Sequence, residues 1–297
     1  MAGRIVIGTS SWADPGFVEE WYPEGLASRD LLPWYAERFD GVEVNTTFYA
    51  VPSRATVRRW AQATPDDFTF DIKLHRSLSR HSAEVETLPK ALRAAAELTP
   101  RGRVRSSQKL DRRLAREYLK AMSPLIDGGK LSSFLLQLSP AFKPGPHDLD
   151  ELDTLLEALA PHPVAVEFRH RAWLKPDRLG ETLAWLEDRN AAFVAVDVPD
   201  GTAPTLVPPV DAVTRDDLAY LRAHGRNAHG WMHGRSVAER FGYRYDDAEL
   251  EELGRRAEEL AGKASNVRMM FNNNRGSDAP DAAGRMRELM GQGAVAR

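Results

Sequence analysis

The feature that most constrains this chain is a regular alternation of short apolar runs with longer amphipathic ones. Amphipathic patterns typical of helices separate most of the short runs, which themselves resemble β-strands. Strands that alternate with helices predict a parallel sheet covered by helices, and eight such repeats predict a TIM-like (β/α)8 barrel. The eight expected strands lie at 4–8, 41–45, 68–73, 132–138, 163–169, 192–198, 218–224 and 266–272.

Capping residues and apolar spacing predict the helices between the strands. Ser28 is expected to cap a helix that carries Leu31 and Phe39, and Ser53 to cap one that carries Val57. Similar spacing predicts helices at 148–159, 177–189, 248–260 and 279–290.

Two connections are irregular. The link at 199–215 contains three prolines and no helical pattern, so the barrel is expected to lack an outer helix between strands six and seven. The basic segment 101–116 is expected to be a solvated or mobile stretch, because acidic residues interrupt it. Without a repeat or a linker, residues 1–297 are read as one domain.

Composition narrows the class of protein. The chain of 297 residues has no cysteine, which excludes disulfides, thiolate catalysis, iron–sulfur clusters and cysteine-based zinc sites. Its net charge of −3 gives no overall attraction to nucleic acid or anionic lipid. Without a membrane-length apolar run or a signal-peptide core, we expect a cytoplasmic protein with no membrane partner.

Charged and polar residues gather at the carboxyl ends of the expected strands. Alternation within each strand puts apolar residues on one face and these residues on the other, which we take to point into the barrel. An antiparallel sheet with one solvated face also alternates, but it would spread polar residues along each strand. The gathering therefore favours a site at the barrel mouth. The inward set comprises Glu43, Asn45, Asp71, Lys73, Gln137, Glu167, Arg169, Asp197, Arg222, His224 and Asn272.

Several short stretches, in order along the chain, match the pattern of a known family. They are Gly8-Thr9-Ser10-Ser11-Trp12, Trp21-Tyr22-Pro23, Val42-Glu43-Val44-Asn45-Thr46-Thr47-Phe48-Tyr49, Gln137-Leu138-Ser139-Pro140, Glu167-Phe168-Arg169-His170, Trp173, Asp197, His224-Gly225-Arg226 and Phe271-Asn272-Asn273. On these residues the chain resembles the YecE-like domain of unknown function 72. The resemblance runs from about residue 8 to 284, and it implies a TIM-barrel-like fold but no assigned reaction.

Four residues are candidates for catalysis. Glu167 and Asp197 end neighbouring strands and could divide the roles of general acid and base. His224 is a candidate for proton transfer, or else a packing histidine held by an acid. Lys73 could form a Schiff base if it is desolvated, or it could pair with a nearby carboxylate. Expected ligand-binding residues are Trp12, Glu43, Asn45, Gln137, Arg169, His170, Trp173, Arg226, Asn272 and Asn273.

These residues favour an enzyme that acts by acid/base chemistry on a small anionic or polyhydroxylated substrate, with no organic cofactor. A divalent metal is an alternative, although Gly230 makes His229 and His233 a poor helical ligand pair. The rival functions are a metal-dependent, nuclease-like barrel that binds nucleic acid, and a non-catalytic ligand-binding barrel. A self-satisfied network of ion pairs would be the purely structural reading of the same charges.

Overall fold

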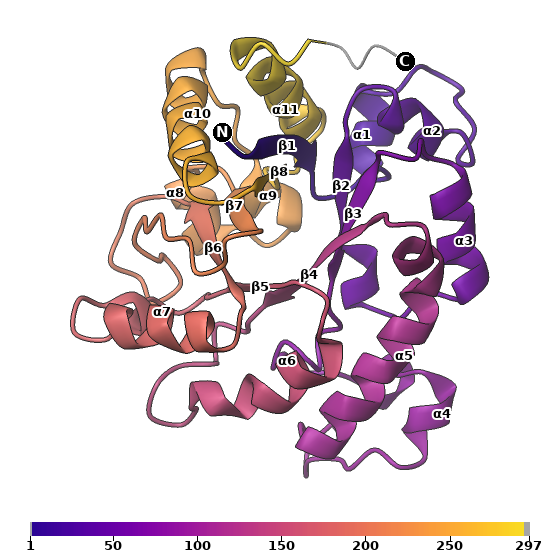
Figure 1. The fold of residues 1–297 in the computed structure, drawn as a ribbon, viewed down its shortest axis with the longest axis vertical. Coiled ribbons are helices and arrows are strands. Elements are labelled where there is room, and N and C mark those ends of the chain that lie inside the picture. The colour runs from indigo at the N-terminus through magenta and orange to yellow at the C-terminus, as the bar shows by residue number, and fades with distance from the viewer. Residues whose placement is uncertain (1, 294–297) are drawn as a thin grey trace.

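The computed structural model describes residues 2–293, in which eight parallel strands surround a central axis and helices lie outside them (Figure 1). The predicted TIM-like barrel is confirmed, and every predicted strand is present within two residues of its expected ends. The strands are β1 (Arg4–Thr9), β2 (Gly41–Val44), β3 (Thr69–Lys73), β4 (Leu131–Gln137), β5 (Val164–Glu167), β6 (Ala192–Asp197), β7 (Ala219–Ala223) and β8 (Asn266–Phe271).

In the hydrogen-bonded order of the strands, β8 follows β1, and the others follow in descending number to β2. The edge strands are therefore β1 and β2, and the barrel closes at the seam between them. The hydroxyl of Tyr35 bridges this seam, because it accepts from the backbone N–H of Thr9 at 2.9 Å and donates to the carbonyl of Gly41 at 3.3 Å. A Cβ atom at Gly8 would lie 2.3 Å from the carbonyl oxygen of Gly41. Glycine at position 8 therefore lets the two edge strands approach.

The six predicted helices are present, and five further helices, at 15–20, 90–93, 108–127, 228–233 and 237–241, were not predicted. Ser53 caps the helix Arg54–Gln62 as predicted, accepting a hydrogen bond from the backbone N–H of Thr56. Ser28 does not cap the first predicted helix, which runs only from Leu31 to Ala36; Asp30 precedes it and makes no capping hydrogen bond through its side chain. The helices are α1 (Pro15–Glu20), α2 (Leu31–Ala36), α3 (Arg54–Gln62), α4 (Lys90–Arg93), α5 (Gln108–Asp127), α6 (Asp153–Leu159), α7 (Leu179–Asp188), α8 (Ala228–His233), α9 (Val237–Phe241), α10 (Asp247–Ala261) and α11 (Asp278–Leu289). Short 3₁₀ turns occupy Thr46–Phe48, Val85–Thr87, Leu149–Leu152 and Arg171–Leu174.

The basic segment 101–116 is a correction to the sequence reading. Its second half is the start of α5, the longest helix of the described chain, rather than a mobile stretch. Ser107 caps this helix, and a regular apolar stripe that includes Leu114 and Tyr118 buries one face. Asp111 is buried too, in an ion pair with Arg80 at 2.9 Å.

The connection from β6 to β7 carries no helix among the described residues, as predicted. None of the helices within 2–293 is long and apolar enough to cross a lipid bilayer.

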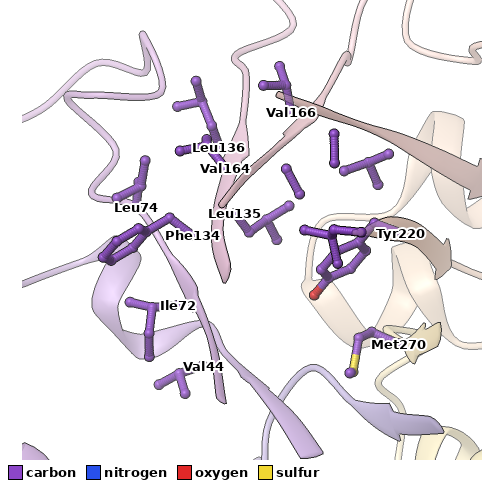
Figure 2. Packing of buried hydrophobic residues seen from close by; sticks show 14 of the residues in the cluster. Val44, Ile72, Leu74, Phe134, Leu135, Leu136, Val164, Val166, Tyr220 and Met270 are labelled. Carbon is purple, nitrogen blue, oxygen red and sulfur yellow. The ribbon is translucent and has the colours of Figure 1, made fainter. Parts of the chain in front are cut away.

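Apolar side chains on the outward strand faces pack against the helices and form the main core. Figure 2 shows this packing, with Val44, Ile72 and Phe134 on the neighbouring strands β2, β3 and β4. The barrel interior is different, because charged groups replace part of its apolar filling. Toward the amino-terminal ends of the strands, Arg268 pairs with Asp71 at 2.6 Å. A Cβ atom at Gly41 would lie only 2.5 Å from the Arg268 guanidinium, so glycine at this position leaves room for it.

Strand β6 corrects one predicted orientation. Parallel register pairs Val196 with Arg222, which points inward, and pairs Asp197 with Ala223, which points outward. Asp197 therefore faces the outer layer and not the barrel interior. Phe193 and Ala195 on one face of β6 are as apolar as the valines on the other face. The alternation within β6 therefore could not show which face points into the barrel.

Candidate active site

A buried ion-pair network fills the upper half of the barrel interior. Arg222 on β7 lies between two carboxylates, with its Nη2 2.5 Å from Glu43 Oε1 and its Nη1 2.5 Å from Glu167 Oε2. The Tyr220 hydroxyl also donates to Glu43 at 3.0 Å, and Gln137 donates to Glu167 at 2.9 Å. All five side chains are buried. One guanidinium thus pairs with two carboxylates out of reach of water, and its single positive charge balances only one of their two negative charges.

His224 extends this network toward the mouth. Its Nε2 lies 3.1 Å from Glu167 Oε1, and its Nδ1 lies 2.9 Å from Asn272 Nδ2. The Asn272 amide oxygen accepts from Ser10 Oγ at 2.5 Å and from Asn45 Nδ2 at 3.4 Å, which leaves its NH2 to donate to the imidazole. Nδ1 then accepts and Nε2 donates. Both ring nitrogens of His224 are engaged.

Burial and pairing fix the charges of this network. Burial alone would raise the pKa of Glu167, but Arg222 and His224 outweigh it and hold the pKa well below its usual range. Burial, together with Arg222, lowers the pKa of His224 to about 4 despite the attraction of Glu167. At neutral pH the carboxylate is therefore ionised and the imidazole is neutral.

Lys73, at the carboxyl end of β3, has a different environment. Its Nζ lies 4.9 Å from the centre of the Phe48 ring, which is also contacted by Arg76 at 5.7 Å and, edge-on, by His81 at 5.0 Å. Among the described residues, no carboxylate or other acceptor lies within hydrogen-bonding distance of this amine. We call Lys73, Arg76, His81 and Arg169 the cationic cluster.

The cationic cluster perturbs its own members. Burial is the largest cause that lowers the pKa of Lys73 to about 7, and Arg222 and Arg169 lower it further, against Glu43 and Glu167. Burial, with the positive charges of Lys73, Arg169 and Arg76, lowers the pKa of His81 to about 4. Two buried nitrogens of the cluster, Arg76 Nε and His81 Nδ1, have no hydrogen-bond partner. Buried donors of this kind ordinarily have one.

Arg169 interacts with both the ion-pair network around Arg222 and the cationic cluster around Lys73. Its Nη1 lies 3.5 Å from Glu167 Oε1, and its guanidinium lies 5.0 Å from the ring of Trp231 on α8. Trp231 also packs edge-on against His224 at 6.1 Å. This tryptophan was not foreseen, because it comes eight residues beyond the end of β7 and shows no strand-end pattern.

Asp197, the predicted partner of Glu167 in acid/base work, belongs to a separate cluster on the outer side of β6. It accepts from Tyr245 at 2.6 Å and pairs with Arg226 at 2.9 Å and with Arg256 at 3.6 Å. Asp197, Arg226 and Arg256 border a cavity of about 720 Å³ beside the connection that lacks a helix. Asp197 and Arg226 therefore do not join the network around Glu167.

The remaining predicted ligand-binding residues lie outside the network. Trp12 packs edge-on against Trp60 at 5.4 Å, and buried Trp173 stacks on Phe142 at 5.5 Å, so both contribute to the hydrophobic core. His170 accepts from the backbone N–H of Ala172 at the start of a 3₁₀ turn.

Asn273 is fully buried, where it donates to the carbonyl of Tyr243. The predicted residues that the structure does bring together are Glu43, Asn45, Gln137, Glu167, Arg169, His224 and Asn272, with Lys73 beside them.

The histidines on α8 correct another expectation. His229 and His233 do share a short helix, capped by the Asn227 side chain, and their rings lie 5.0 Å apart. Within residues 2–293, however, no three histidine or acidic side chains come together in a way that could hold a metal ion.

Comparison with known proteins identifies the family. The model for a protein of unknown function, DUF72, matches residues 6–297. The UPF0759 protein YunF of Bacillus subtilis strain 168 is 28% identical over 293 residues, covering 96% of this chain and 94% of YunF. The UPF0759 protein YecE of Escherichia coli K12 is 31% identical over 180 residues, covering 60% of this chain and 53% of YecE.

Solved structures agree with this assignment. A DUF72 family protein from Thermotoga maritima MSB8 superposes with a TM-score of 0.77 at 27% identity, covering 97% of this chain and 99% of its own. One from Enterococcus faecalis V583 gives a TM-score of 0.76 at 25% identity and 98% coverage of both chains. The resemblance seen in the sequence is confirmed: the chain belongs to the DUF72 family, a TIM-like barrel family with no established activity.

Proposed function

We propose that this protein is an enzyme that acts on a small anionic substrate at the barrel mouth, with Lys73 as the group that transfers protons. The observation that carries the proposal is the Lys73 amine itself. It is 9% exposed, it lacks an acceptor among the described residues, and it lies at the carboxyl end of a barrel strand. That end is where barrels of this class hold their sites.

The surroundings of Lys73 support an anionic substrate. Arg76 and His81 share the Phe48 ring with it, and Arg169 approaches from β5. The neighbouring carboxylates Glu43 and Glu167 both pair with Arg222, and Glu167 also lies 3.5 Å from Arg169, so two guanidiniums balance the two carboxylates. An arriving anion would supply an acceptor for the buried Arg76 Nε, which has no hydrogen-bond partner, and for Lys73 Nζ, which no acceptor among the described residues holds. It would also offset the repulsion within the cationic cluster.

Proton transfer is best supported at Lys73. A group whose pKa lies near the working pH can both accept and donate a proton, and the pKa of Lys73 is about 7. His224 is less suitable, because both of its nitrogens are occupied and its pKa is about 4. Glu167 stays ionised between Arg222 and His224, so its role in this proposal is to hold those two groups in place.

Anion binding tests the first half of the proposal, with inorganic phosphate as the probe. Phosphate should raise the melting temperature of the wild type, and Lys73→Met should lose most of that rise. Lys73→Arg, which keeps a cation at the site, should retain it. Lys263→Met is the matched control, because Lys263 is exposed and lies just before β8, at the end of the barrel opposite the mouth. An equal rise in all four proteins would contradict an anion site at Lys73.

Turnover tests the second half. Wild type, Lys73→Arg and Lys73→Met are each incubated with a mixture of small phosphorylated and carboxylated metabolites, and mass spectrometry follows their conversion. The wild type should convert at least one anionic compound, and both variants should lose that conversion by ~100-fold or more, the scale of a general acid–base contribution. If phosphate binds at Lys73 but no compound is converted, the barrel is a binding protein and not an enzyme.

A further inference from the structure

The chain has two buried lysines, and their amines differ in one respect. Lys130 Nζ donates to the carbonyls of Ala61 and Thr64, both at 2.7 Å, and to Thr64 Oγ1 at 3.3 Å. Lys73 Nζ has no such acceptor among the described residues and rests against the face of Phe48. A buried ammonium needs partners, whereas a neutral amine does not. The contrast shows that protein acceptors hold the amine of Lys130, whereas none among the described residues holds the amine of Lys73.

The groups around Lys73 match the needs of an amine nucleophile. A lysine becomes nucleophilic when an apolar contact desolvates it or when neighbouring cations disfavour its protonation. Phe48 supplies the apolar contact, and Arg169 and Arg222 supply the cations. Since the pKa of Lys73 is about 7, roughly half of these amines are neutral at pH 7.

We propose that the Lys73 amine forms an imine with a small aldehyde or ketone that carries a phosphate or carboxylate group. This inference rests on the proposed function, because it assigns a covalent step and a substrate class to the same amine. The anionic group of the substrate would bind Arg76, which shares the Phe48 ring with the amine, and Arg169, whose positive charge acts on the amine.

The step balances without an oxidant or a reductant. The Nζ lone pair forms a bond to the carbonyl carbon while the C=O π electrons move to oxygen, and a proton passes from nitrogen to that oxygen. The resulting hydroxyl takes up one proton from solvent and leaves as water, while the nitrogen lone pair forms the C=N bond. Amine, carbonyl compound and one proton give an iminium ion and water.

Binding of the anion would prepare the site for the positive charge of the iminium. Before binding, Arg169 and Arg222 disfavour a charge on Lys73 Nζ, which keeps the amine reactive. An anion on Arg169 and Arg76 removes part of that repulsion, and the attraction of Glu43 and Glu167 for a positive nitrogen remains. The same cluster therefore favours a neutral amine when empty and a cationic product when filled.

Two anionic aldehydes, pyridoxal 5′-phosphate and glyoxylate, serve as probes. Each is incubated with the full chain at pH 7, the imine is reduced with sodium cyanoborohydride, and peptide mass spectrometry locates the label. Lys73 should be labelled ~10-fold or more faster than buried Lys130 and exposed Lys175, because its amine is uncharged in about half of the molecules at pH 7 and no acceptor among the described residues holds it. Inorganic phosphate should slow labelling at Lys73 alone.

Lys73→Arg keeps the positive charge but cannot form the imine, so its labelling at the barrel mouth should disappear while that of the other lysines is unchanged. Two sizes of probe guard against simple exclusion of the larger one. If neither labels Lys73 faster than Lys175, the imine inference is overturned. The proposed function fails separately, when phosphate stabilises wild type and Lys73→Met equally.

Discussion

The two sides of the barrel mouth hold the same kinds of side chain but differ in whether the charged groups are paired. On one side Arg222 is enclosed by Glu43 and Glu167, and His224 completes the network, so that every charge has an opposite partner. On the other side Lys73 and Arg76 face an aromatic ring and lack such partners within the described chain. Both sides lie at strand ends, and Lys73 is buried like Arg222, Glu43 and Glu167, whereas Arg76 is half-buried. Pairing, rather than residue type or position, separates a structural cluster from a candidate site.

The largest expected effect breaks the paired side. Arg222→Met leaves Glu43 and Glu167 buried without their common partner, and removal of one member of a buried ion pair is strongly destabilising. We expect a loss of about 5 kcal/mol in the free energy of unfolding, measured by guanidinium titration. Arg285→Met, at an exposed ion pair, is the control and should leave the midpoint near that of wild type. A small effect at Arg222 would remove the distinction between the two sides.

A smaller effect is expected when one carboxylate of the same side is neutralised. Glu167→Gln keeps the shape of the side chain but takes a charged acceptor from Arg222, His224 and Arg169. We expect a loss of about 3 kcal/mol, because Glu43 still pairs with Arg222. Thermal and chemical unfolding with and without phosphate measure it. An unchanged stability together with lost phosphate binding would instead make Glu167 part of the binding site.

The sequence predicted the barrel well because its cues are local. Strand alternation and helix caps such as Ser53 act over a few residues, and they located all eight strands. The same cues failed where they carried no direction. Both faces of β6 are apolar, so nothing in the alternation told that Asp197 points outward. The helix α5 was missed because its exposed arginines hid a buried apolar stripe.

The sequence predicted which residues gather at the candidate site, but it did not predict which of them pair with one another. Strand ends gave Glu43, Glu167 and His224 as neighbours, because parallel strands present their carboxyl ends at one rim. Which acid holds which cation depends on packing between strands far apart in sequence, as between Glu43 and Arg222. Lys73 follows Asp71 by two residues, which suggested a pair, yet Asp71 lies lower in the barrel with Arg268. The missing partner of Lys73 is visible only in three dimensions.

The smallest expected effect, and the only one that stabilises, belongs to the unpaired side. The pKa of Lys73 falls from 10.5 to about 7 on folding, so the folded protein binds the proton less well than the unfolded chain does. Below pH 7 Lys73 is protonated in both states, and holding this charge in the folded protein lowers the free energy of unfolding by its full amount. Between pH 7 and 10.5 the folded protein releases the proton while the unfolded chain keeps it, so the free energy of unfolding rises with pH. Lys73→Met should therefore be more stable than wild type by on the order of 2 kcal/mol at pH 6, and the gain should shrink steadily toward pH 10.

Lys130→Met is the control. It leaves two backbone carbonyls without their hydrogen-bond donor, so it should be less stable than wild type across the same pH range. Urea titrations of the three proteins at intervals from pH 6 to 10 test this, and a Lys73→Met variant less stable than wild type at pH 6 would mean that the amine has a partner after all.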